Sequence, residues 1–165
     1  SGVELALARN HMPDRSGYYP RWVTTRVEPS RCVFTRALEP GTLLPLPVAH
    51  GEGRFTSREA GRVEALARGG QVPLRYASSD GATALAFPAN PNGADAAAAA
   101  VCNGQGNVLA LMPHPERAQD AGALPPSVAG AWGEARATAR LRGDRDAPGP
   151  GLLLFEALRR HLEEG

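Results

Sequence analysis

The sequence contains no lysine, only two cysteines and few aromatic residues, which make up 5% of its 165 positions. Its 18 basic residues are therefore all arginines, and 17 acidic residues leave a formal net charge of +1. Because the arginines are scattered and almost balanced, this charge excludes a nucleic-acid or membrane-surface role that depends on bulk electrostatics. Two cysteines, Cys32 and Cys102, cannot form a disulfide framework, which favours a reducing, cytoplasmic setting.

Long apolar runs are also missing. No segment approaches membrane-spanning length, and none has the pattern of a signal peptide. The chain opens at Ser1 with residues typical of the middle of a domain, so we expect a truncated N-terminus. The remaining composition, 42% hydrophobic over 165 residues, is enough for a single domain with a core built mainly from Ala, Leu and Val.

Five segments have the alternation or composition of β-strands: residues 21–28, 43–49, 73–78, 96–102 and 107–112. Pro45 and Pro47 interrupt the second segment, which places it at a sheet edge or makes it irregular. The alanine-rich 96–102 segment favours a helix by propensity. Its position, directly before a Gly-rich turn and another strand, favours one arm of a hairpin, and we predict a strand there.

Three helices are expected. Residues 56–59 have capping-box form and open a short helix. Residues 119–150 show little periodicity and predict a surface insertion with one helical stretch at about 132–141. The final helix, at about 152–163, should bury four apolar residues at helical spacing: Leu154, Phe155, Leu158 and Leu162.

The most informative segment is a β-favouring run that ends in Pro113-His114-Pro115-Glu116. Side chains alternate along an extended backbone, so His114 and Glu116 should project the same way. A carboxylate in that place can hold an imidazole in one tautomer, as a catalytic base requires. Taken alone, a His-x-Glu pair is more often surface decoration or a core hydrogen bond. As metal ligands the two residues supply at most two donors, and no other cluster has ligand spacing.

Two glycine- and asparagine-containing loops form a second group of candidates. His50-Gly51-Glu52-Gly53 allows a tight turn and a close backbone approach, although an ordinary strand connection explains it equally well. Asn90-Pro91-Asn92-Gly93 is a turn-forming segment whose Asn side chains cap the backbone locally. Cys102 precedes a small-residue turn that is similar to a nucleophile elbow. Such an elbow needs a helix directly after it, and here a strand follows, so a buried hairpin residue is the favoured interpretation.

In series, these segments resemble a known family. The matching segments occur in the family's order and spacing: 8–10, 21–28, 47–55, 75–76, 88–93, 102–103 and 106–118. Together they are similar to the glutamine amidotransferase subunit of phosphoribosylformylglycinamidine synthases, over Leu5 to Ala118 and loosely in the last helix. Several independent motifs in series make this signal far more specific than a lone His-Pro-Glu.

The resemblance implies an α/β fold, the flavodoxin-like three-layer sandwich of class I glutamine amidotransferases. It also implies a Cys-His-Glu triad in which His114 is the general base and Glu116 orients it. The loops that contain His50, Glu52, Asn90 and Asn92 would lie near the glutamine pocket or the partner interface. The partner would be the synthase subunit, which would carry ATP and Mg, and the resemblance implies no cofactor in this chain and no metal site.

One departure from the family pattern is large. The family's nucleophile elbow precedes the segment that residues 5–10 resemble, so residues 1–165 would form one partial domain without it, interrupted by the insertion at about 119–150. Three hypotheses follow: a glutaminase portion whose nucleophile lies elsewhere, a truncated and inactive fragment that only binds the synthase subunit, and a hydrolase that uses Cys102 with His114 and Glu116.

Overall fold

A five-stranded antiparallel sheet forms the centre of the computed structural model, which describes residues 5–164. The strands of the chain are β1 (Ala6–Ala8), β2 (Tyr19–Val27), β3 (Leu43–His50), β4 (Arg54–Thr56), β5 (Leu74–Ala77), β6 (Ala98–Cys102) and β7 (Leu109–Leu111). The helices are α1 (Arg62–Arg68), α2 (Gly130–Arg142) and α3 (Leu152–Glu164), with short 3₁₀ turns η1 (Asp95–Ala97), η2 (Pro115–Arg117) and η3 (Ala121–Ala123).

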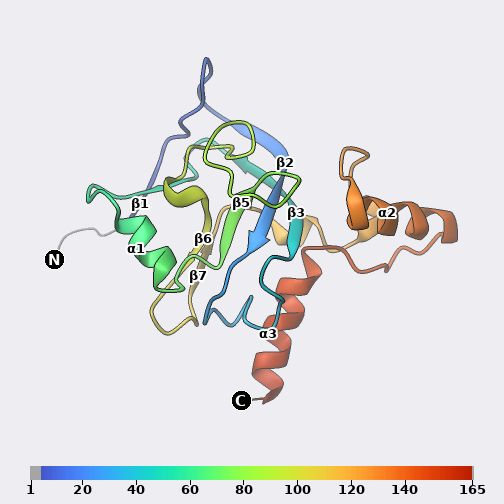
Figure 1. Cartoon of the computed structure of the whole chain (residues 1–165). Helices are drawn as coiled ribbons and strands as arrows, with labels where there is room; N and C mark the ends of the chain where they lie inside the picture. The colour runs from blue at the N-terminus through green and yellow to red at the C-terminus, as the bar shows by residue number, and fades with distance from the viewer. Residues whose placement is uncertain (1–4, 165) are drawn as a thin grey trace.

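The main sheet has the strand order β3-β2-β5-β6-β7, and each pair of neighbours is antiparallel. A separate antiparallel pair joins β1 to β4. Figure 1 shows α1 on one side of this body, α3 running below it, and α2 standing out beyond β3. Helices around a sheet give the α/β class that the sequence predicts. Within residues 5–164, no helix has the length and hydrophobicity needed to span a bilayer.

Strand β3 lies at one edge of the sheet, as its prolines predict. Pro47 pairs with Trp22 and Pro45 with Thr24 in the β2–β3 register. Proline has no N–H to donate, so a strand with two prolines is tolerated where only one side is paired. Leu44, Leu46 and Val48 alternate with the prolines and enter the core.

The β6–β7 hairpin confirms the strand prediction for the alanine-rich segment. All five residues of β6 are buried, so small side chains fit where the sheet is covered, and tertiary packing overrides the helical propensity of alanine. At the turn, the side-chain oxygen of Asn103 accepts hydrogen bonds from the N–H groups of Asn107 and Val108, both at 3.1 Å.

Two helix predictions need correction. Helix α1 begins at Arg62 and not after residues 56–59, because the left-handed residue Gly61 precedes it and no side chain caps it. In α3, Leu154 is buried as predicted, but Phe155 and Leu162 are 39% and 72% exposed. The helix touches the body along a narrower stripe than its apolar pattern predicts, and Ala157 occupies the second buried position.

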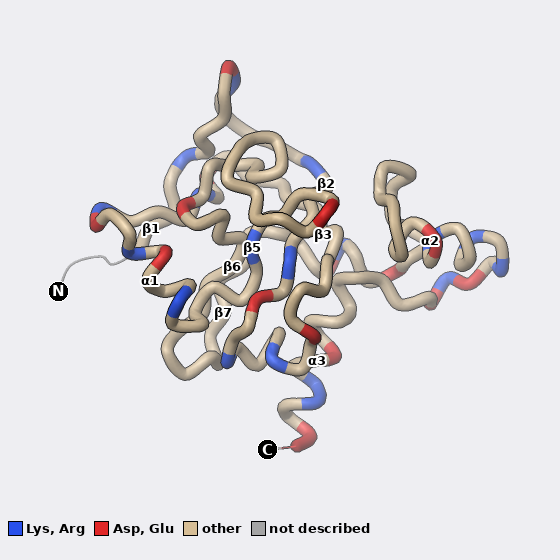
Figure 2. Tube along the Cα trace, viewed as in Figure 1, with Lys and Arg blue, Asp and Glu red and all other residues tan. Residues whose placement is uncertain are grey.

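The two ends of the segment between residues 119 and 150 lie side by side, so this segment forms an excursion from the rest of the molecule. Gly149 N–H donates to the Gln119 carbonyl at 2.7 Å, and Ala121 N–H donates to the Ala147 carbonyl at 2.8 Å. Helix α2 lies within this excursion and contains the helical stretch expected at 132–141. Figure 2 shows acidic and basic residues mixed over the molecule, in line with the absence of a basic stripe in the sequence.

Candidate active site

The centre of the candidate site is the contact between His114 and Glu116. After β7, His114 begins the η2 turn, in which Pro115 occupies the first position. His114 Nδ1 lies 2.7 Å from Glu116 Oε1, and the two side chains are 33% and 51% exposed. The sequence predicts this pairing through strand alternation, but the structure achieves it across a 3₁₀ turn.

This geometry determines which ring nitrogen is available for chemistry. A carboxylate only accepts hydrogen bonds, so Nδ1 of His114 carries a proton and donates it to Glu116. No described residue hydrogen-bonds to Nε2, so in the neutral ring this nitrogen presents its lone pair to solvent or a ligand. Arg117 Nε also approaches Glu116 Oε1, at 3.8 Å, but both side chains are exposed and this ion pair is weak.

His50, from the second group of candidates, lies close to this pair in space. His114 N–H donates to the carbonyl of Pro47 at 2.8 Å, which attaches the segment after β7 to β3, the strand that ends at His50. Burial lowers the pKa of His50, and the positive charge of nearby His114 lowers it further. Two histidines that are 64 positions apart in the sequence are thus electrostatic neighbours.

The two asparagines of the other loop are buried, and most of their side-chain hydrogen bonds are to backbone groups. Asn90 Oδ1 accepts from the N–H groups of Gly93 and Ala94, at 3.0 and 3.1 Å. Asn92 Nδ2 donates to the Gly53 carbonyl at 2.7 Å and lies 3.5 Å from Nε2 of His50. Asn92 therefore joins the two candidate loops, whereas Asn90 holds its own turn.

Glu52, a predicted site residue, lies outside the hydrogen-bond network of His50, whereas Asn10, which was not predicted, belongs to it. Glu52 is exposed and its carboxylate lies 3.5 Å from Arg9 Nε, which places it away from the histidines' hydrogen bonds. Asn10 lies inside the network, with Oδ1 3.0 Å from Nδ1 of His50. In the sequence, Asn10 stands out only as part of the segment 8–10 that matches the family. It stands between Arg9 and His11 after the short strand β1, and no local pattern distinguishes it from these polar neighbours.

Neither cysteine is placed to serve as the nucleophile for His114. Cys102 pairs with Leu109 at the turn end of the β6–β7 hairpin. On the way toward His114, the last bond of the hairpin joins the Met112 N–H to the Ala99 carbonyl. Ala99 lies three residues of extended strand, roughly 10 Å, from Cys102. His114 lies two residues beyond Met112, so the third hypothesis, a Cys102 hydrolase, is wrong.

Cys32 is fully buried and free. Burial raises the pKa of its thiol to about 11, and nearby Cys102 adds to the effect. A thiol of this kind is almost entirely protonated at neutral pH and is not an activated nucleophile. Among residues 5–164, no group of three or more His, Cys, Asp or Glu side chains is arranged to hold a metal ion.

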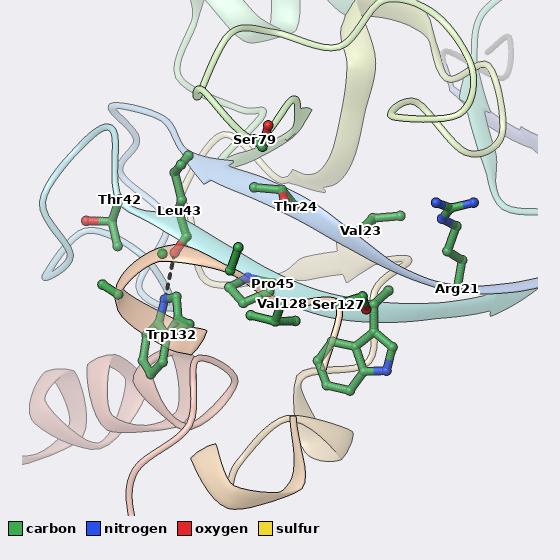
Figure 3. A pocket seen from close by; sticks show the side chains of 14 residues that line it. Arg21, Val23, Thr24, Thr42, Leu43, Pro45, Ser79, Ser127, Val128 and Trp132 are labelled. Carbon is green, nitrogen blue, oxygen red and sulfur yellow. Dashed lines mark hydrogen bonds between the residues drawn. The ribbon is translucent and has the colours of Figure 1, made fainter. Parts of the chain in front are cut away.

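A cavity of about 780 Å³ lies elsewhere, between β2, β3 and the start of α2. Both tryptophans, Trp22 and Trp132, line it, and Figure 3 shows Trp132, whose Nε1 donates to the Leu43 carbonyl at 2.9 Å. None of the candidate residues of the site, His114, Glu116 or His50, lines this cavity. It is therefore separate from the His–Glu pair.

Comparison with known proteins decides the family. The family model for the CobB/CobQ-like glutamine amidotransferase domain matches residues 5–161. The chain belongs to this family. The fold class and the resemblance expected from the sequence are thereby confirmed.

Two relatives of this glutamine amidotransferase domain are subunits of phosphoribosylformylglycinamidine synthases. Phosphoribosylformylglycinamidine synthase subunit PurQ of Methanothrix thermoacetophila is 37% identical over 170 residues, which cover 99% of this chain and 60% of the relative. The subunit of the same name from Thermomicrobium roseum is 54% identical over 99 residues, 60% of this chain and 41% of the relative.

A solved structure, that of PurLQS from Thermotoga maritima, is similar with a TM-score of 0.59 at 28% identity. The match covers 97% of this chain and 54% of that one. The chain thus spans about half the length of the proteins that it matches.

Proposed function

We propose that this chain supplies the proton-transfer residues of a glutaminase, the glutamine amidotransferase component of a phosphoribosylformylglycinamidine synthase. The observation that carries the proposal is the 2.7 Å contact between His114 and Glu116, which leaves Nε2 of His114 open. Membership of the amidotransferase family and the similarity to PurQ subunits support it. Ammonia released from glutamine would serve the amidation of formylglycinamide ribonucleotide in purine biosynthesis.

In the proposed reaction, a cysteine thiol transfers its proton to Nε2 of His114 and attacks the side-chain amide carbon of glutamine. A carbon–sulfur bond forms, the carbon–nitrogen bond breaks, and the proton on His114 leaves with ammonia. Water then attacks the thioester with the same imidazole as base. A carbon–oxygen bond forms, the carbon–sulfur bond breaks, the proton on His114 returns to the sulfur, and glutamate is released. Glu116 keeps the proton on Nδ1 and stabilises the imidazolium that forms between the steps.

The proposal assigns no nucleophile to residues 5–164. Cys32 and Cys102 are buried, and Cys102 lies at the far end of its hairpin from His114. We therefore propose that the reacting thiol comes from a part of the enzyme outside these residues and that the chain alone does not hydrolyse glutamine.

The partner follows from the same proposal. A synthase subunit would receive the ammonia and would hold ATP and Mg, with no cofactor bound by this chain, and the assembly would be cytoplasmic. A second candidate function is a fragment that binds the synthase subunit without catalysis. It is favoured by the absence of a cysteine near His114 among the described residues.

A glutamine-analogue affinity label tests the assignment of the thiol. Treated alone, the chain should be labelled at neither Cys32 nor Cys102 when its peptides are mapped by mass spectrometry. Labelling of Cys102 that glutamine prevents would contradict the proposal, since the chain would then carry its own nucleophile.

A reconstitution experiment separates the two candidate functions. The chain is combined with the synthase subunit and a segment that carries the family's nucleophile elbow. Glutamine-dependent amidation should appear and should be lost in His114→Ala, whereas amidation with added ammonia should remain. The matched control is His161→Ala on α3, which should keep both activities. Binding of the chain without any glutamine-dependent activity would favour the non-catalytic alternative.

A further inference from the structure

The imidazole of His50 is held from both sides by amides. Its Nδ1 lies 3.0 Å from Asn10 Oδ1, and its Nε2 lies 3.5 Å from Asn92 Nδ2. The ring also packs directly on Gly53, where an added Cβ would lie 2.5 Å from ring atoms. His50 is therefore fixed in position by the side chains of Asn10 and Asn92, from two other segments of the chain, and by the backbone of Gly53 in its own loop.

The hydrogen bonds of the two asparagines determine the tautomer of His50. Asn10 Nδ2 donates to the His50 carbonyl at 2.7 Å and to the Gly17 carbonyl at 3.2 Å, so Oδ1 is the end that faces the ring. An amide oxygen only accepts, and Nδ1 of His50 must therefore carry the hydrogen.

The amide of Asn92 faces the other ring nitrogen. Its Nδ2 donates to the Gly53 carbonyl at 2.7 Å and to the Tyr76 hydroxyl at 3.3 Å, and its Oδ1 accepts from Ala94 N–H at 3.0 Å. The group that faces Nε2 of His50 is thus an N–H donor. A neutral ring with a lone pair on Nε2 satisfies both asparagines, whereas a protonated ring would place two N–H groups against each other at Asn92.

The charged and titratable groups around His50 also favour the neutral ring. Glu52, in the same loop, is exposed and paired with Arg9. Tyr76, whose hydroxyl contacts Asn92 at 3.3 Å, is fully buried, and burial raises its pKa so that it stays protonated. His114 also acts on His50, and its positive charge adds to burial in lowering the pKa of His50.

We propose that His50 is a positioning residue of the His114 site, held as the neutral Nδ1–H tautomer between Asn10 and Asn92. This inference rests on the proposed glutaminase function, in which His114 carries a proton between two steps. A second cation in the same partly buried cluster would disfavour that state, because like charges repel there more than in water. An uncharged imidazole leaves His114 as the single cation of this cluster while it fixes the loop of residues 50–53.

The first test needs no enzymatic activity. Long-range ¹H–¹⁵N spectra of the chain report the tautomer and titration of each of its four histidines. His50 should show the Nδ1–H tautomer at neutral pH. In His114→Gln its titration should move to higher pH, since the charge that lowers its pKa is gone, and in His161→Gln it should not move. An Nε2–H tautomer, or an unchanged titration in His114→Gln, would overturn the inference even if His114 proves essential for glutamine hydrolysis.

The second test uses the reconstituted enzyme and two substitutions of His50, one to a neutral residue and one to a cationic residue. His50→Asn keeps a neutral donor toward Asn10, so kcat should fall by less than about ten-fold. His50→Lys adds a cation, so kcat should fall by about a hundred-fold or more while KM changes little. Thermal melts of both variants separate this effect from unfolding. Equal losses of kcat in the two variants, in proportion to lost stability, would show a purely structural role and overturn the proposal.

Discussion

The backbone N–H of His114 donates to the carbonyl of Pro47 at 2.8 Å, and this bond joins opposite ends of the sheet order. Pro47 belongs to β3, the first strand of the order β3-β2-β5-β6-β7, and His114 follows β7, the last. The sheet is therefore curled enough for its two edges to meet. Because β3 is unpaired on its outer side, its carbonyls are free to accept such a bond.

Removal of the carboxylate should impair the reaction without removing the imidazole. In Glu116→Gln, nothing forces the proton onto Nδ1 of His114 and the imidazolium loses its counter-charge. We expect kcat for glutamine hydrolysis in the reconstituted enzyme to fall by about 10²- to 10⁴-fold, with ammonia-dependent amidation retained. Arg117→Gln is the matched control, because the ion pair that it removes is exposed. A loss in Arg117→Gln as large as that in Glu116→Gln would show that the assignment is wrong.

Gly53 should be intolerant of even a methyl group. An added Cβ would lie 2.5 Å from the ring of His50, which the two asparagines prevent from moving. We expect Gly53→Ala to lower the free energy of unfolding by about 1–3 kcal/mol. At Gly104 nothing lies within 4 Å of the added atom, so Gly104→Ala should change stability by less than about 0.5 kcal/mol. Chemical denaturation measures both, and equal effects would contradict the close packing at His50.

Alkaline pH should destabilise the chain partly through Cys32. Burial raises the pKa of its thiol from 9.0 to about 11. Above pH 9 the unfolded state loses this proton while the folded state keeps it, so the stabilising effect is complete below pH 9 and declines until pH 11.

The pH effect can be measured by comparing two proteins. Cys32 should contribute a loss of at most about 3 kcal/mol between pH 8 and pH 11. Urea unfolding at the two pH values should show a smaller decline for Cys32→Ala than for the wild type. Tyr76 titrates in both proteins and cancels in the comparison. Parallel declines would mean that the Cys32 thiol ionises as readily in the folded state as in the unfolded one.

Trp132 should connect the excursion at 119–150 to the sheet. Its indole N–H donates to the Leu43 carbonyl at 2.9 Å, and the ring forms part of the wall of the cavity in Figure 3. Trp132→Phe keeps a ring but leaves that carbonyl without its donor, so stability should fall by about 1–2 kcal/mol. Leu141→Ala, at an exposed position of α2, should have almost no effect. Thermal melts of the two variants provide the comparison, and an unchanged melt for Trp132→Phe would refute the connection.

Local sequence patterns were sufficient for the elements whose signals come from neighbouring residues. The alternation in 21–28 predicts β2, the prolines of 43–49 predict an edge position for β3, and the Pro-flanked His114–Glu116 pair is found in contact. These signals depend on backbone stereochemistry and on side chains two residues apart, and both are present in the sequence itself.

The predictions that were wrong concern features that depend on contacts between segments distant in the sequence. Helix α1 starts later than its capping pattern predicts, because Ser57 N–H donates to Asp95 Oδ2 at 3.3 Å and holds the chain outside the helix. Phe155 and Leu162 lie on an apolar stripe that the rest of the chain only partly covers. Burial depends on what packs opposite a residue, and no local pattern contains that information.

The sequence by itself therefore determined the β-rich order of elements, the His114–Glu116 pair and, through motifs in series, the family. Only the tertiary structure decided that His50, Asn10 and Asn92 form one network beside His114, and that Cys102 lies too far away to react there. The reason is physical: the curl of the sheet brings the ends of β3 and β7 together, and the β6–β7 register carries Cys102 to the opposite end of its hairpin.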